Sequence, residues 1–103
     1  ATGQDPIAWL KKYPNRFRYC HVKDIYPEAK VKEIMTTEKI DPQLPYNASC
    51  NLGTGRIDFA TILKVAAENG TQHFVVEQER FDAGTKLQAA KADADYMNKL
   101  VLA

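Results

Sequence analysis

The chain has 103 residues, of which 45% are hydrophobic and 26% charged, with a formal net charge of +1 at pH 7. This is the composition of an ordinary globular protein, and it excludes a disordered or fibrous chain. The lysines are scattered rather than clustered, so we expect no nucleic-acid partner and no membrane partner. No apolar stretch approaches the roughly 20 residues that span a bilayer. We expect no targeting segment in this piece, which leaves the localisation, cytoplasmic or periplasmic, unknown.

The two cysteines, Cys20 and Cys50, are too few for a disulfide framework. Their spacing does not match a zinc motif. We therefore expect two free thiols.

The N-terminal segment predicts a helix followed by a strand. Asp5 can cap the free N–H groups of a helix, and Pro6 tolerates the first helical position. This helix should end before Pro14. Residues 17–23 then alternate in character along the chain, as a strand does.

Residues 24–56 show no sustained period and are punctuated by prolines and glycines, so we expect one long strand-to-helix loop. Connections longer than roughly 12–15 residues are usually functional or disordered. This loop is a candidate lid over the end of the strand, and a solvated insertion is the alternative. Gly53 and Gly55 lack the full spacing of a nucleotide-binding motif, and we interpret them as part of a turn.

The rest of the chain predicts a helix, a strand and a second helix. Asp58 should cap the first of these helices and Gly70 should end it. Residues 73–78 are rich in Val and Phe and predict a strand. Thr85 and Gln88 have the spacing of a capping box, which opens the last helix. The expected core-facing stripes are Phe59, Ile62, Leu63 and Ala66 on one helix and Leu87, Ala90, Ala94, Met97 and Val101 on the other.

Four polar side chains should meet where the two strands end. Strand–helix–strand order favours a parallel pair, and functional groups in parallel sheets gather at the C-terminal ends of the strands. Side chains alternate between the faces of a strand, so His21 and Lys23 share one side, as do Glu77 and Glu79. Neighbouring strands would bring these four residues into one cluster.

The chemistry of this cluster suits a metal, but the residues alone leave alternatives open. An imidazole and a carboxylate are ligands that Mn²⁺, Zn²⁺ or Co²⁺ accept, although two ligands are too few for a catalytic site. By position alone, His21 is more simply a core histidine bonded to backbone. Glu77 could instead form a buried salt bridge with Lys23, and Lys23 could pair with Glu79 at the rim.

Three motifs, in this order, resemble the end of the sugar-phosphate isomerase/epimerase family, the xylose-isomerase-like TIM barrels. They are HVKD at 21–24, LGTGRIDF at 52–59 and FVVEQE at 74–79. The segment DPIAWLKKYPNRF at 5–17 is similar to the helix before strand seven of that family. The resemblance implies an α/β fold in which residues 1–103 are the C-terminal fragment of one (β/α)8 barrel domain, containing strands seven and eight with their flanking helices. Such a fragment is incomplete on its own.

The resemblance also implies roles for the four clustered residues. His21 and Glu77 match metal ligands for a divalent ion, which could be Mn, Mg, Co or Zn, and a glutamate and an aspartate on earlier strands would complete the site. Glu77 would also be the catalytic residue in proton transfer through an enediolate, as in a metal-dependent isomerase or epimerase acting on a sugar or sugar phosphate. Lys23 and Glu79 are expected to bind the carbohydrate substrate. Epimerases of the family often have a substrate-binding arginine soon after the histidine, whereas this chain has residues 24–27, DIYP, there.

Two other functions are weighed against this one. Metal-dependent phosphodiester hydrolysis of the endonuclease IV-like kind would need clustered zinc ligands and a basic groove, which this sequence does not predict. A non-catalytic barrel is the other alternative. Whatever the function, the fragment on its own should expose Tyr19 and Val75, which a closed barrel would bury. It should pack against the rest of the barrel or other copies of the chain. Alone, it should be inactive.

Overall fold

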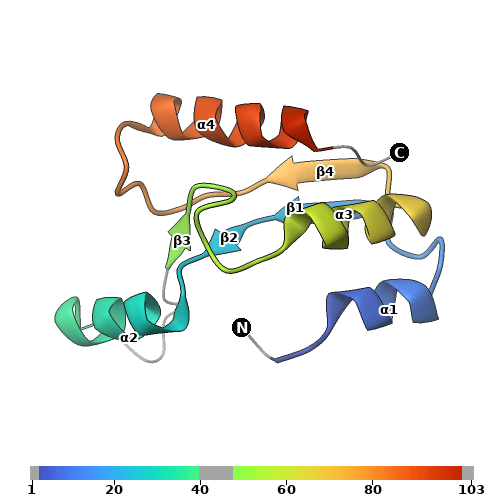
Figure 1. The fold of residues 1–103 in the computed structure, drawn as a ribbon, viewed down its shortest axis with the longest axis horizontal. Helices are drawn as coiled ribbons and strands as arrows, with labels where there is room; N and C mark the ends of the chain where they lie inside the picture. The colour runs from blue at the N-terminus through green and yellow to red at the C-terminus, as the bar shows by residue number, and fades with distance from the viewer. Residues whose placement is uncertain (1–2, 40–47, 101–103) are drawn as a thin grey trace.

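The computed structural model describes residues 3–39 and 48–100. This part of the chain contains four helices and four short strands (Figure 1). No helix within it is long and apolar enough to cross a membrane. The elements are α1 (Pro6–Lys12), β1 (Tyr19–Val22), β2 (Asp24–Ile25), α2 (Glu28–Thr37), β3 (Ser49–Cys50), α3 (Phe59–Glu68), β4 (His73–Val76) and α4 (Lys86–Lys99).

The two longer strands, β1 and β4, form the parallel pair that the sequence predicts. Their register places His21 beside Val75. The ladder continues past the strand ends, because the Glu77 N–H donates to the Val22 carbonyl at 3.0 Å. Strands β2 and β3 form a separate antiparallel pair, in which Asp24 lies opposite Cys50. The C-terminal ends of β1 and β4 therefore lie at the same edge of their sheet.

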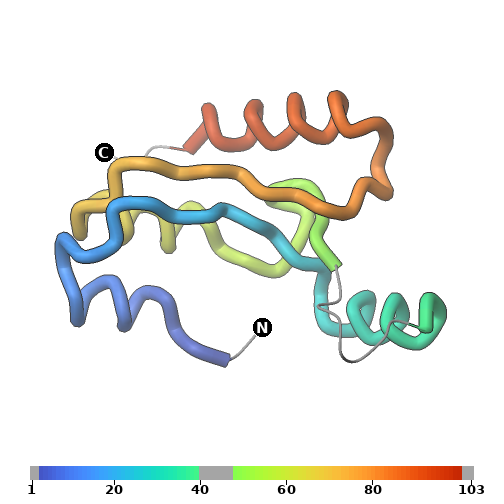
Figure 2. The backbone as a smooth tube through the Cα atoms, turned by 180° about the vertical axis from the view of Figure 1, so that it is seen from behind, coloured from blue at the N-terminus to red at the C-terminus, as the bar shows by residue number. Residues whose placement is uncertain are grey.

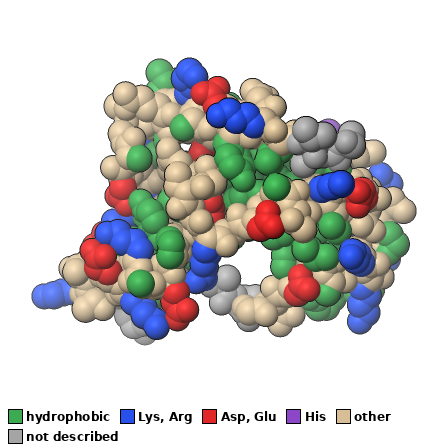
Figure 3. Space-filling view, in the orientation of Figure 1, with side chains coloured by type: hydrophobic (Ala, Val, Ile, Leu, Met, Phe, Trp, Pro, Cys, Tyr) green, Lys and Arg blue, Asp and Glu red, His purple; other side chains and the backbone are tan. Residues whose placement is uncertain are grey.

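One face of the β1–β4 pair is covered and the other is open. Alternate residues of the strands pack into a core centred on Val22 and Leu63, which are almost fully buried. Figure 2 shows the strands uncovered when the molecule is seen from behind, with α3 on their far side. On this open face Tyr19 is 71% and Val75 is 48% exposed, as expected for an isolated piece of a barrel. Figure 3 shows hydrophobic side chains gathered around β4 and α3 on the opposite face.

The predicted helix caps are confirmed. Asp5 accepts a hydrogen bond from the Ile7 N–H, and Asp58 accepts one from the Thr61 N–H. Thr85 and Gln88 form a complete capping box, in which each side chain accepts from the other residue's backbone N–H. Caps of this kind are worth about 1 kcal/mol each, which explains why these helices begin where the sequence indicates.

The expectation of one long structureless loop over residues 24–56 is wrong. This segment contains α2 as well as β2 and β3, and residues 40–47 lie outside the described part. Helix α2 buries only Val31 and Ile34, which pack with Ala48 in a small core of their own. Ion pairs on its surface, such as Lys32 with Glu28 at 3.0 Å, support the helix locally. Two apolar positions are too few to produce a visible helical period.

The apolar stripe predicted for the last helix is also largely wrong. Helix α4 buries Ala89 and Asp93, whereas Leu87 is 80% exposed. The predicted stripe did not include Asp93 because a charged residue was not expected in the core. Its burial is compensated by a hydrogen bond of 2.8 Å from the Leu52 N–H. Of the other predicted positions, Ala90 and Ala94 are exposed, Met97 packs against the core and Val101 lies outside the described residues.

Candidate functional site

The structure brings the four predicted side chains together at the C-terminal ends of β1 and β4. His21 Nδ1 lies 2.8 Å from Glu77 Oε2. The other oxygen of the same carboxylate, Oε1, lies 3.2 Å from Lys23 Nζ. Lys23 Nζ also contacts Glu79 Oε2 at 2.5 Å. Glu77 thus connects the imidazole to the ammonium, and Lys23 connects the two carboxylates.

The side chains of His21 and Glu77 are partly exposed in this chain. The His21 side chain is 69% exposed, and its Nδ1 contacts the Glu77 carboxylate, so within this chain His21 is not buried in the core. The Lys23–Glu77 salt bridge is present, but its side chains are 35% and 36% exposed rather than buried. Ion pairs as open as these contribute little to stability.

The ion pairs shift the pKa values of two groups in the cluster. The hydrogen bond and the positive charge of Lys23 hold the pKa of the Glu77 carboxyl below its usual range. The hydrogen bond to Glu79, followed by that to Glu77, raises the pKa of Lys23, against a smaller lowering by burial. At neutral pH Glu77 is a carboxylate, the form that can bind a cation or accept a proton.

The His21–Glu77 pair fits one part of a metal site. A ring nitrogen and a carboxylate oxygen within hydrogen-bonding distance are both ligands of Mn²⁺, Zn²⁺ and Co²⁺. Among residues 3–39 and 48–100, no group of three or more His, Cys, Asp or Glu side chains is arranged to hold a metal ion. The chemistry of the two donor groups therefore fits a divalent metal ion, but two ligands make only part of a metal site.

A buried carboxylate beside the cluster was not predicted. Asp24 follows Lys23 directly and is only 1% exposed. Its Oδ2 accepts hydrogen bonds from the N–H groups of Gly53 and Gly55, at 2.9 and 3.0 Å. The only signal for this contact in the sequence was the pair of glycines, Gly53 and Gly55, with one residue between them. The interpretation of Gly53–Gly55 as a turn is consistent with the structure, because these N–H groups bind a side chain of the chain itself.

A second network lies beside the cluster and connects α2 to the segment after β4. The Arg80 side chain binds Asp82 through Nε at 2.6 Å, and its Nη1 lies 2.9 Å from Glu38 Oε2. Tyr26 Oη donates to the same Asp82 carboxylate at 2.9 Å. Arg80 lowers the pKa of the Glu38 and Asp82 carboxyls, chiefly by hydrogen bonding. Nothing in the sequence indicated that α2 and this segment would meet.

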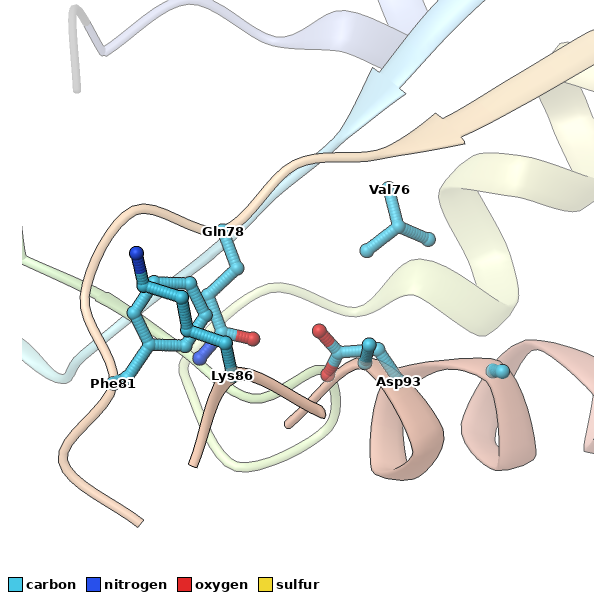
Figure 4. Close-up of a pocket in the computed structure, with 7 residues that line it drawn as sticks. Val76, Gln78, Phe81, Lys86 and Asp93 are labelled. Atoms are coloured by element: carbon cyan, nitrogen blue, oxygen red, sulfur yellow. The ribbon is translucent and has the colours of Figure 1, made fainter. Parts of the chain in front are cut away.

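A groove of about 310 Å³ lies between the end of β4 and α4, away from the cluster. Figure 4 shows Gln78 and Asp93 facing the same space in it, with Phe81 and Lys86 nearby. The buried Oε1 atom of Gln78 has no hydrogen-bond partner among the described residues. Buried polar atoms are seldom left in this state, so the groove is an incomplete environment for Gln78.

Comparison with known proteins finds similarity to inosose dehydratases of Clostridium species. The chain is 35% identical over 85 residues to that of Clostridium botulinum (strain Alaska E43 / Type E3), a match that covers 79% of this chain and 27% of the relative. It is 36% identical over 81 residues to that of Clostridium perfringens (strain ATCC 13124), covering 77% and 27%. It is 31% identical over 83 residues to that of Clostridium tetani (strain Massachusetts / E88), covering 79% and 27%.

The chain spans about a quarter of the length of the curated relatives it matches. No family model matches it. No solved structure matches it. It is therefore similar to a part of proteins named inosose dehydratases.

Proposed function

We propose that this chain is part of a metal-dependent (β/α)8-barrel enzyme that removes a proton next to the carbonyl of a sugar or a related polyhydroxy ketone. In this proposal His21 and Glu77 are two of the metal ligands, and Glu77 also moves the proton. The observation that carries the proposal is the exposed contact of 2.8 Å between His21 and Glu77 at the ends of two parallel strands. In barrels of this type, active sites lie at that end of the strands.

Three features support the proposal that this chain is one portion of a larger barrel. Among residues 3–39 and 48–100, β1 and β4 form a sheet of two strands, so each has an edge that no other described strand pairs with. The open face exposes Tyr19 and Val75, which a closed barrel would cover. The buried Gln78 Oε1 faces a groove where it finds no donor among the described residues. We refer below to the protein that contains this chain and the rest of the barrel as the longer protein.

The proposed reaction begins with transfer of a proton from carbon to a carboxylate. The Glu77 carboxylate accepts the proton, and the C–H electron pair moves toward the carbonyl oxygen, which gives an enediolate or enolate. A bound divalent ion supplies electrostatic stabilisation of negative charge on substrate oxygens. Return of the proton to a neighbouring carbon is isomerisation, and return to the other face is epimerisation. Loss of an adjacent hydroxyl group as water, with the proton that Glu77 took from carbon, is dehydration, which is the reaction that the names of the relatives give.

Lys23 and Glu79 are proposed to bind hydroxyl groups of the substrate. An ammonium has three N–H donors, and two of them point to Glu77 and Glu79. The third can donate to a substrate hydroxyl without breaking either ion pair. The Glu79 carboxylate is 53% exposed and can accept a hydrogen bond from a second hydroxyl. Together the two side chains would orient a polyol beside Glu77.

Deuterium exchange in the longer protein tests this function. In D₂O, wild-type protein should exchange the proton next to the carbonyl of inosose, as followed by proton NMR, whatever the final product is. Replacing Glu77 by Gln should slow exchange and turnover by roughly 10²–10⁴-fold, the usual contribution of a general base. Glu28→Gln is the matched control, because Glu28 is 70% exposed on α2 and pairs with Lys32. Unchanged exchange in the Glu77→Gln variant would rule out this proposal.

The same experiment distinguishes the possible reactions. A product that has lost water indicates dehydration, and a product of unchanged mass indicates isomerisation or epimerisation. Exchange without a net product would still support proton transfer by Glu77. A wild-type protein that shows neither exchange nor turnover with inosose or related ketoses would contradict the proposed class of reaction.

A further inference from the structure

The buried Asp24 carboxylate, beside the exposed cluster, accepts four backbone hydrogen bonds. Its Oδ1 accepts from the N–H groups of Ile25 at 2.9 Å and Ile57 at 3.3 Å. Its Oδ2 accepts from those of Gly53 and Gly55. Each oxygen therefore binds two backbone donors, and three of the four donors belong to the loop that precedes α3. Asp24 fixes the path of residues 51–57 against the end of β1.

The sequence of this loop is adapted to the carboxylate. A Cβ atom on Gly55 would lie 2.2 Å from Asp24 Oδ1, which no side chain can occupy. Gly53 has a φ of +81°, and a Cβ atom there would lie 2.4 Å from the ring of Tyr96. Both positions require glycine for different reasons, so the loop is held in one conformation between Asp24 and α4.

The same loop and the adjacent strand β3 hold the segment after β4. Asn51 Oδ1 accepts a hydrogen bond of 2.8 Å from Gln78 Nε2. Ser49 Oγ accepts from the backbone N–H groups of Glu79 at 3.2 Å and Arg80 at 3.1 Å. Residues 78–80 are thus attached to the segment that Asp24 fixes. A continuous chain of contacts runs from the end of β1 to the end of β4.

We propose that Asp24 is a positioning residue for the metal-binding pair, acting through residues 49–57 to set the distance between Glu77 on one strand and His21 on the other. This inference rests on the proposed function. The β1–β4 ladder brings the two residues together, but the pair itself is exposed and its ion pairs are weak, so its side-chain contacts do little to hold the geometry. Residues 78–80 are anchored instead by groups whose positions depend on Asp24. Supporting residues of this kind typically change metal affinity by 10–100-fold.

The test measures Mn²⁺ binding to the longer protein by calorimetry, in the absence of substrate, together with the free energy of unfolding. Asp24→Asn keeps the shape of the side chain but replaces one acceptor oxygen by a donor, so two of the four N–H groups lose their partner. Ser49→Ala is a milder variant that removes the acceptor for the backbone of residues 79 and 80. Thr71→Val is the matched control, because Thr71 is 5% exposed and donates at 2.7 Å to the Phe17 carbonyl at the opposite end of the strands.

We expect Asp24→Asn and Ser49→Ala to weaken Mn²⁺ binding by roughly tenfold, while Thr71→Val lowers stability without changing the affinity. If Asp24→Asn does not fold, Ser49→Ala decides the result. Unchanged affinity in the folded variants, or an equal loss in Thr71→Val, would overturn the inference. A Glu77→Gln variant separates the two proposals. If it retains full Mn²⁺ affinity, both the proposed function and this inference fail. If Glu77→Gln loses affinity but Asp24→Asn and Ser49→Ala do not, the proposed function stands and only the inference fails.

Discussion

His21 Nδ1 and Glu77 Oε2 lie 2.8 Å apart, although α2, α3 and both strands of the small antiparallel sheet separate them in the sequence. The parallel register of β1 and β4 brings them together, because it places His21 beside Val75, two residues before Glu77 on the same face. The contact is therefore a property of the fold, and a change in register by one residue would turn one partner to the opposite face.

The pKa of Glu77 should depend on Lys23. Replacing Lys23 by Met removes the hydrogen bond and the positive charge that lower this pKa, so it should rise toward the ordinary value of 4.5. The measurement is an NMR titration of the Glu77 carboxyl in metal-free protein. Lys64→Met is the control, because Lys64 lies on α3, away from the cluster. A Glu77 pKa that stays low in Lys23→Met would show that another group causes the shift.

The same shift has a consequence for stability. The pKa of Glu77 is lower in the folded than in the unfolded chain, so its contact with Lys23 stabilises the folded chain above pH 4.5. This stabilisation is lost as the pH falls through the pKa that Glu77 has in the folded chain. Lys23→Met should therefore reduce the difference in unfolding free energy between neutral and acidic pH. Urea unfolding at several pH values measures this difference, and an unaltered pH dependence would contradict the assignment.

The loop that Asp24 holds should not tolerate a side chain at Gly55. Gly55→Ala would place a methyl group 2.2 Å from Asp24 Oδ1 and 2.3 Å from the Ile25 carbonyl oxygen. Overpacking of this kind costs about 1–3 kcal/mol of unfolding free energy, which urea denaturation of the longer protein can measure. Thr54→Ala in the same loop removes an exposed hydrogen bond to the Asn51 carbonyl and a contact with Cys50, without introducing a clash, and should cost less than about 1 kcal/mol. Equal stability of the two variants would contradict this description of the loop.

Helix α2 should depend on Arg80 for its attachment. Arg80→Ala removes the contact with Glu38, the residue that follows α2, and should increase amide hydrogen exchange in this helix roughly fivefold. Lys32→Ala is the control, since it removes an exposed ion pair with Glu28 inside α2 without affecting a tertiary contact. Hydrogen exchange followed by mass spectrometry compares them. If both variants increase exchange equally, the tertiary contact of Arg80 has no special role.

Much of the local structure could be predicted because single residues determine it. Asp5, Asp58 and the Thr85–Gln88 pair each specify a helix start through one or two hydrogen bonds, and these interactions are local in sequence. The period-two pattern of β1 and β4 likewise placed the four cluster residues on matching faces. The prediction that β1 and β4 are neighbours was possible because strand–helix–strand order allows few topologies.

The parts that could not be predicted depend on contacts between distant segments. The burial of Asp24 and Asp93 depends on N–H donors from residues 52–57. These donors are far from both aspartates in the sequence, so the residues around each aspartate do not indicate that it is buried. Helix α2 buries too few apolar residues to show a period. Leu87 has the appearance of a core residue but is exposed here, on the helix that borders the incomplete groove. In each case the relevant partner is remote in sequence or belongs to another part of the longer protein in our proposal.

The most direct measurement is an anomalous-scattering crystal structure of the longer protein soaked with Mn²⁺. We predict a manganese peak about 2.0–2.3 Å from both a His21 ring nitrogen and a Glu77 carboxylate oxygen, with the direct hydrogen bond between these two side chains replaced by the ion. Further ligands would come from other strands of the barrel. A structure without such a peak, in which His21 and Glu77 remain hydrogen-bonded to each other, would contradict the assignment of this pair as metal ligands.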